Sequence, residues 1–205
     1  MLLGILILYE EVGTSDFRLI SLSNFSFLNQ KFLWVLFFLG FAVKVPMLPV
    51  HIWLPEAHVE APTAGSVLLA GLLLKLGTYG MLRLLIPCFS LGSFYFLPLV
   101  FTFCLLGILY TSCVTIRQID LKKIIAYSSV VHMNFCLLGL FSNNLVGLSG
   151  SIFLMLSHGI VSGGLFLVIG LLYERYHSRL IKYYGGLVQF MPLFSFFFIL
   201  FTLAI

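Results

Sequence analysis

The chain has 205 residues, of which 61% are hydrophobic and only 9% are charged. Soluble domains carry about a quarter charged residues, so this composition excludes a disordered chain and a small secreted scaffold. The net charge of +4 gives no basic footprint for nucleic acid. A membrane span takes about 20 apolar residues plus a connection, so the length accommodates roughly six spans and little else. The sequence therefore predicts an all-α, polytopic bundle of transmembrane helices that forms a single membrane domain.

Apolar segments separated by short polar or proline-containing loops predict the spans in chain order. The first segment, about 1–9, is too short to cross a membrane and is followed directly by Glu10 and Glu11. Complete spans are expected at about 31–54, 63–86, 92–116, 122–141 and 146–172, and an incomplete one at about 186–205.

Proline and glycine residues predict breaks within two of these spans. Pro46 and Pro49 fall inside the first complete span and predict a kink or a break near Lys44. Broken helices in membranes line polar cavities, and in transporters they flank ion sites. An ordinary proline kink and close helix packing at glycines are the alternative explanations. Glycines are also expected to interrupt the span at 146–172, and these are Gly159, Gly163 and Gly164.

Four protonatable side chains fall at a similar depth in their predicted spans. At a rise of about 1.5 Å per residue, Lys44 and Lys75 lie roughly 18–20 Å from the starts of their spans. His132 and His158 lie roughly 15–18 Å into theirs. Because the apolar core is about 30 Å thick, all four fall near the bilayer midplane. A lysine there costs at least about 2.5–3.5 kcal/mol and is too far from an interface to snorkel.

Groups of this kind are suited to passing protons. Burial disfavours the charged form of a lysine, and histidine changes charge near neutral pH. The sequence therefore predicts a proton relay of Lys44, Lys75, His132 and His158. For either histidine alone, a structural hydrogen bond to a neighbouring serine is an equally good explanation. The two histidines on neighbouring spans also leave open a haem-binding electron carrier, and a purely structural membrane piece is a further alternative.

The loop at 55–62 holds Glu56, His58 and Glu60, and His51 precedes it. The spacing lacks the HExxH pattern of a zinc site, and prolines at both ends predict a stiff surface turn without a metal. The four cysteines stand singly without a CxxC pair, as expected for buried free thiols.

Basic residues are distributed unequally between the two sides of the predicted bundle. Loops 55–62, 117–122 and 173–186 share one side, which the positive-inside rule places in the matrix or cytoplasm. That side and its edges hold Arg117, Lys122, Lys123, Arg175, Arg179 and Lys182, against Arg18, Lys31 and Arg83 on the other.

The stretch 43–67, VKVPMLPVHIWLPEAHVEAPTAGSV, closely resembles the antiporter-like, proton-pumping subunits of respiratory complex I, of the NADH dehydrogenase subunit 4 type. The same family is matched by LLLKLG at 72–77, by DLKKIIAYSSVVHM at 120–133, and by a stretch that opens with SHG at 157 and ends with LYER at 175. The resemblance covers essentially the whole chain. Subunits of multi-subunit cation/proton antiporters share the lysines, so an antiporter subunit is the nearest alternative.

The resemblance implies an antiporter-like bundle with broken helices that moves protons as part of NADH:ubiquinone reductase. Lys44 resembles the family's lysine beside the first broken helix and Lys75 its central lysine, while His132 and His158 match histidines in its row of polar residues. The resemblance further implies that this chain binds no cofactor, because NADH, FMN, iron–sulfur clusters and ubiquinone belong to other subunits. The implied location is the mitochondrial inner membrane, or alternatively a bacterial cytoplasmic membrane.

The family's subunits are longer than this chain. The resemblance implies a glutamate partner for Lys44 in a helix before Met1 and a further charged relay residue beyond Ile205. We therefore expect other membrane-arm subunits of complex I, including neighbouring antiporter-like ones, as partners within the lipid bilayer. A separately encoded chain is expected to supply the missing helices, and no nucleic acid is expected.

Overall fold

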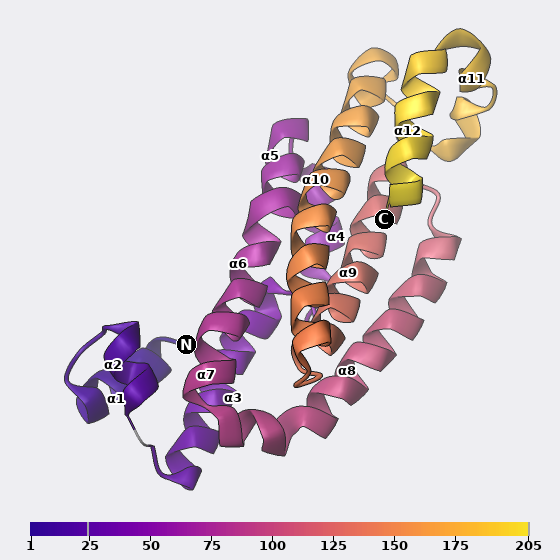
Figure 1. Cartoon of the computed structure of the whole chain (residues 1–205). Coiled ribbons are helices and arrows are strands. Elements are labelled where there is room, and N and C mark those ends of the chain that lie inside the picture. Colours follow the sequence, from indigo (N-terminus) through magenta and orange to yellow (C-terminus); the bar gives the residue numbers. More distant parts are fainter. Residues whose placement is uncertain (24, 205) are drawn as a thin grey trace.

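The computed structural model describes residues 1–23 and 25–204, which form helices joined by short loops (Figure 1). Within these ranges, pairing of extended backbone is limited to one isolated bridge between Asp120 and Leu180. Five helical segments are long and apolar enough to cross a membrane, which agrees with the predicted all-α membrane bundle. They are α3 (Phe27–Lys44), the continuous run Thr63–Cys88, α8 (Ser90–Arg117), α9 (Leu121–Leu140) and α10 (Leu145–Tyr176).

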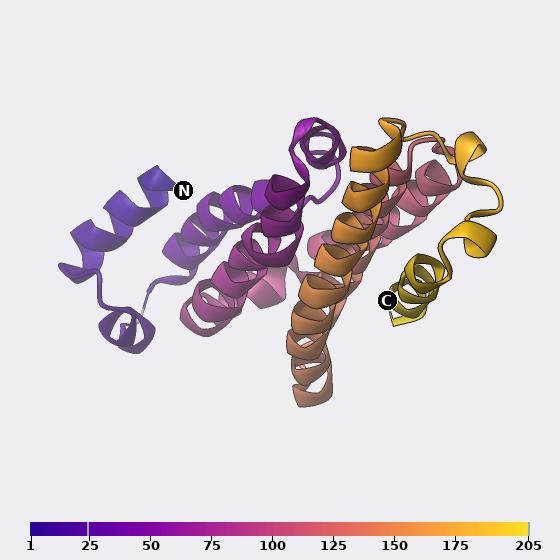
Figure 2. The same ribbon diagram turned by 90° about the horizontal axis from the view of Figure 1, so that it is seen from above.

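Shorter helices lie at the two ends of the bundle (Figures 1 and 2). At one end, α1 and α2 come before the first span, and α1 packs against α3. At the other end, α12 lies against α10. Their bounds are α1 (Leu2–Val12), α2 (Phe17–Leu22), the 3₁₀ turn η3 (Ile181–Tyr184), α11 (Leu187–Phe190) and α12 (Pro192–Ala204).

The first predicted span, 31–54, is divided between two helices. The helix α3 begins at Phe27 and ends at Lys44, and the short helix α4 (Trp53–Glu60) follows after a turn. Pro46 and Pro49 lie in the turn, where neither nitrogen has a hydrogen to donate to the preceding helical turn. The predicted break near Lys44 is therefore confirmed, and the chain beyond it forms a helix that packs against α9.

The helix α10 runs through Gly159, Gly163 and Gly164 without interruption, so the predicted break at these glycines is wrong. The glycines face neighbouring helices instead. A Cβ on Gly159 would lie 3.2 Å from the carbonyl oxygen of Gly71, and one on Gly164 would lie 2.8 Å from the Phe201 ring. They therefore provide close helix packing, the alternative explanation that the sequence left open.

The run Thr63–Cys88 contains two π-helical segments and no break. It consists of α5 (Thr63–Leu68), the π-helical segment η1 (Leu69–Leu73), α6 (Leu74–Gly80), a second π-helical segment η2 (Met81–Leu85) and α7 (Ile86–Cys88). In η1 the amide of Leu74 donates to the carbonyl of Leu69, five residues back. Wide turns of this kind occur frequently at functional sites.

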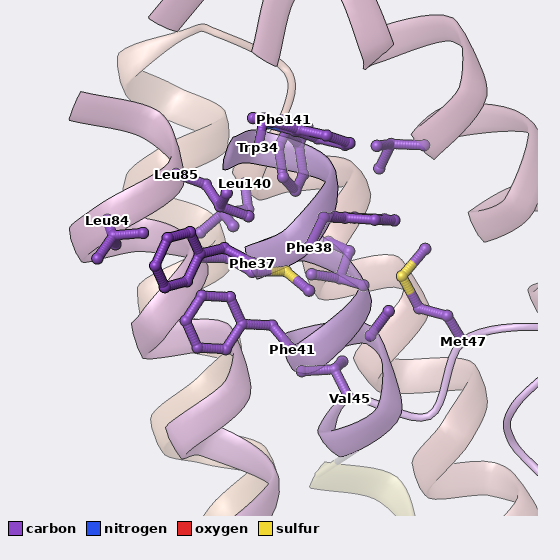
Figure 3. Close-up of a cluster of buried hydrophobic side chains, with 14 of the residues drawn as sticks. Trp34, Phe37, Phe38, Phe41, Val45, Met47, Leu84, Leu85, Leu140 and Phe141 are labelled. Atoms are coloured by element: carbon purple, nitrogen blue, oxygen red, sulfur yellow. The ribbon is translucent and has the colours of Figure 1, made fainter. Parts of the chain in front are cut away.

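The hydrophobic core centres on aromatic side chains of α3 (Figure 3). The Trp34 ring stacks on Phe38 and Phe96 at centroid distances of 4.5 and 4.7 Å. Its Nε1 donates to Oγ of Ser93 on α8 at 3.0 Å, so the indole is both packed and hydrogen-bonded. In Figure 3, Phe37 and Leu84 lie together where α3 meets η2. This packing fixes α3 in the bundle and thereby sets the position of Lys44 at its end.

Gly170 lies where α10 meets the start of α5, and a Cβ there would lie 2.9 Å from Cβ of Thr63. We expect Gly170→Ala to lower the thermal midpoint of the assembled protein, because overpacking typically costs about 1–3 kcal/mol. Gly150→Ala on the same helix is the matched control, since nothing lies within 4 Å of a Cβ at that position. Equal midpoints for the two variants would contradict the packing assigned to Gly170.

Candidate functional site

The ammonium of Lys75 contacts a histidine on the neighbouring helix. Its Nζ lies 2.8 Å from Nδ1 of His158 on α10 and donates to the carbonyl oxygen of Ala70 at 2.6 Å. An ammonium has only donors, so Nδ1 of His158 accepts and the proton of the neutral ring sits on Nε2. His158 is 3% exposed. The structure thus brings two of the predicted relay residues into direct contact.

The wide turn η1 creates the second partner of Lys75. In a regular α-helix the carbonyl of Ala70 would accept from the amide of Leu74. Here that amide donates to Leu69, so the Ala70 carbonyl is available to the lysine. Gly159 completes the arrangement, because a Cβ at this position would lie 3.2 Å from the Gly71 oxygen and 3.5 Å from Cε of Lys75.

The third predicted relay residue, His132, lies beside His158. The two ring centroids are 5.9 Å apart and the rings are tilted by 46°. Nε2 of His158 is buried and has no hydrogen-bond partner among the described residues. Lys75, His158 and His132 therefore form a row of three titratable side chains from α6, α10 and α9.

Lys44 lies apart from this row. It is the last residue of α3, and it lines a small cavity of about 150 Å³ together with Trp53, Leu69, Leu73 and Leu74. Among the described residues, no hydrogen bond joins its ammonium to the other three relay residues. Leu74 immediately precedes Lys75, so the cavity of Lys44 adjoins the segment that carries the central lysine.

A histidine that the sequence assigned to a surface turn is completely buried. His58 is 0% exposed, and its ring stacks on Phe166 of α10 with centroids 4.4 Å apart and planes at 9°. Both ring nitrogens are buried and lack hydrogen-bond partners in the described part of the chain. The surface turn predicted for 55–62 is therefore wrong. Pro55 occupies the first turn of α4, where proline is compatible with a helix, and Leu54 and His58, four residues apart, share the buried face.

Burial and the nearby ammonium of Lys122 lower the pKa of His58 from 6.5 to about 4. Lys122 itself is 1% exposed, and its Nζ donates to the carbonyl of Ala61 at 3.1 Å. Arg179 donates to the carbonyl of Val59 at 2.8 Å. Both cations therefore bind the C-terminal end of α4, where the helix dipole favours positive charge. The burial of Lys122 does not follow from its place beside a basic loop.

Residues 1–205 match the family described as NADH:quinone oxidoreductase/Mrp antiporter, TM. The chain belongs to this family. Family membership and the five apolar helices together identify it as an integral membrane protein with the antiporter-like fold.

Relatives and solved structures refine this placement. A relative from Acanthamoeba castellanii named NADH-ubiquinone oxidoreductase chain 4 is 63% identical over 195 residues, which are 95% of this chain and 39% of the relative. A chain of the respiratory complex I from Thermus thermophilus with bound NADH superposes with a TM-score of 0.93 at 30% identity, over 99% of this chain and 44% of that one. A chain of the Mrp complex from Dietzia sp. DQ12-45-1b gives 0.74 at 26%, over 82% and 32%.

The match to chain 4 relatives agrees with the resemblance expected from the motifs at 43–67 and 120–133. This chain spans 39% of the length of the Acanthamoeba relative. It is more similar to the Thermus complex I chain than to the Mrp chain in both identity and TM-score.

The lowered pKa of His58 predicts a pH-dependent stability. Between pH 6.5 and about 4 the unfolded chain binds a proton that the folded chain does not. The stabilisation is therefore complete above pH 6.5 and is lost as the pH falls toward 4, by up to about 1.4 kcal/mol per pH unit. We expect His58→Phe, which keeps the stacking on Phe166, to show a shallower fall in thermal midpoint over this range than the wild-type protein.

His177→Asn is the control for this experiment, because His177 is exposed and asparagine tolerates its left-handed backbone conformation. The control variant should follow the wild-type profile. Identical profiles for wild type and His58→Phe would contradict a neutral, buried His58.

Proposed function

We propose that this chain is a proton-translocating membrane segment of respiratory NADH:ubiquinone oxidoreductase, complex I, and that Lys44, Lys75, His158 and His132 relay the protons. The observation that carries the proposal is the 2.8 Å contact between Lys75 and the buried His158 inside the bundle of membrane helices. The 63% identity to a relative named NADH-ubiquinone oxidoreductase chain 4 supports it.

The contact allows a defined proton transfer. When Nζ of Lys75 gives its proton to Nδ1 of His158, the ring becomes an imidazolium that can release the other proton from Nε2. Nε2 is the atom without a partner in the described residues, and His132 is its neighbouring titratable group. One water molecule between the rings would complete the path to His132. Lys75 would be reloaded from the side of Lys44.

Burial and hydrogen bonding have opposite effects on the charge of Lys75. Burial in an apolar bundle favours the neutral amine, whereas the carbonyl of Ala70 accepts a hydrogen bond and favours the ammonium. A small electrostatic change nearby is then enough to load or unload the lysine. Lys44, whose cavity includes the preceding residue Leu74, is placed to supply that change.

His58 extends the polar row toward the end of the bundle that holds Lys122. It stacks on Phe166, which lies two helical turns or about 12 Å beyond His158 on α10. Between these levels, the buried Ser162 donates to the carbonyl of His158 at 2.6 Å. We infer that this end of the bundle, where the loops 117–122 and 173–186 carry basic residues, faces the matrix.

Lys44 requires a partner from elsewhere in the assembled protein. From Phe27 to Tyr173 the acidic residues are Glu56, Glu60 and Asp120, and all three lie outside the spans. We therefore propose that helices outside residues 1–205, including those of other membrane-arm subunits, provide the carboxylates that pair with the relay lysines.

We further propose a location in the mitochondrial inner membrane, in contact with its lipids. The redox groups of the complex, NADH, FMN, iron–sulfur clusters and ubiquinone, would be bound by other subunits and not by this chain. The haem-carrier alternative is disfavoured because α9 and α10 pack directly against each other at His132 and His158, where a porphyrin would have to fit. The antiporter alternative is disfavoured by the lower similarity to the Mrp chain.

Lys75→Met removes the proton carrier, and we expect it to abolish coupled proton translocation while the complex still assembles. Lys75→Arg should act similarly, because a guanidinium keeps the charge and cannot release its proton. The measurement is the number of protons translocated per NADH oxidised in sealed membrane vesicles. Lys182→Met, at an exposed loop lysine, is the control and should keep the wild-type ratio. A wild-type ratio in both Lys75 variants would refute the proposed function.

A further inference from the structure

The break after Lys44 exposes backbone carbonyls that side chains from two other helices bind. Nε1 of Trp53, in α4, donates to the carbonyl of Val43 at 2.9 Å. Nδ2 of Asn134, in α9, donates to the carbonyl of Pro46 at 3.4 Å. The two hydrogen bonds lie on either side of Lys44 in the sequence. In an apolar environment such carbonyls need partners, so these two side chains hold the shape of the break.

Asn134 is held in a site that fits its carboxamide. The side chain is 0% exposed, and Nδ2 also donates to the carbonyl of Val130 at 2.8 Å. Both partners are carbonyls, which fixes the orientation of the amide and directs Oδ1 away from them. Oδ1 is buried without a partner among the described residues. Gly107 of α8 leaves room for the group, since a Cβ there would lie 3.0–3.1 Å from the carboxamide atoms.

The hydrogen bonds on the two sides of Lys44 differ in strength. The bond from Trp53 has an ordinary length, whereas the 3.4 Å bond from Asn134 to Pro46 is long and therefore weak. Asn134 is on the same helix as His132, two residues away, so its bond to Pro46 joins the break directly to α9.

We propose that Asn134 is a positioning residue of the relay: it ties the break behind Lys44 to α9, so that a change at Lys44 alters the placement of His132. This inference rests on the proposed function and deepens it. Asn134 itself carries no proton, because a carboxamide does not titrate in the accessible pH range. Its contribution is the link between the lysine at the end of α3 and the histidine row.

The test is Asn134→Leu in the assembled complex, with proton yield per NADH and the rate of NADH oxidation measured in the same vesicles. We expect the proton yield to fall toward that of Lys75→Met while NADH oxidation is retained, because the linkage is lost and the redox arm is untouched. A purely structural defect would lower both together with the amount of assembled complex. Thr111→Val is the matched control, since its buried hydroxyl bonds only to Gly107 of its own helix.

Gly107→Ala is a second, independent variant that displaces the carboxamide without removing it. It should lower the proton yield, as Asn134→Leu does. If the Asn134→Leu complex does not assemble, the proton yield of Gly107→Ala tests the role of Asn134. The double variant Lys44→Met/Asn134→Leu should yield no less than Lys44→Met alone, because both changes act on one linkage.

The outcomes separate the two proposals. If Lys75→Met lowers the proton yield but the Asn134→Leu and Gly107→Ala complexes assemble and keep the yield of Thr111→Val, the role of Asn134 is overturned and the relay stands. If the Lys75 variants keep the wild-type yield, the relay and the role of Asn134 both fall.

Discussion

The contact between Lys75 and His158 is the interaction on which the rest of the site depends. An ammonium deep in a membrane span is costly unless it has partners, and this one has a carbonyl and an imidazole nitrogen within 2.8 Å. The carbonyl is available because η1 is wound as a π-helix, and the imidazole is near because Gly159 allows α10 to approach. A local change in helix geometry and a glycine contact together make the buried lysine tolerable.

The break after Lys44 organises the other half of the molecule. Because α3 stops there, the chain can turn and place α4 against α9, which buries His58 and brings the end of α4 to Lys122 and Arg179. The same break leaves backbone carbonyls that need donors within the bundle, and Trp53 and Asn134 provide them. The prolines of the break thus leave backbone carbonyls without helical partners, and side chains from other helices bind these carbonyls.

The predictable features of this site depend on single segments of the chain, whereas the others depend on contacts between helices. The break at Pro46 follows from a missing amide hydrogen, and the shared depth of Lys75, His132 and His158 follows from the helical rise; both are local properties. The role of Gly159 in close helix packing, instead of a helix break, was not predictable. A glycine in a membrane helix can weaken that helix or allow another helix to approach, and the outcome depends on which helix lies beside it. His58 was missed because prolines at 55 and 62 suit a turn and a helix start equally well.

The sequence by itself determined that the chain is a bundle of membrane helices, where the first span breaks, and that Lys75, His132 and His158 fall within its spans. These follow from apolar length, proline geometry and the cost of burying charge, which act along a single segment. Only the tertiary structure decided that Lys75 binds His158 while Lys44 lies apart, that His58 is buried, and that Asn134 reaches Pro46. Those contacts join residues 83, 108 and 88 positions apart, and they depend on how helices rotate and approach one another.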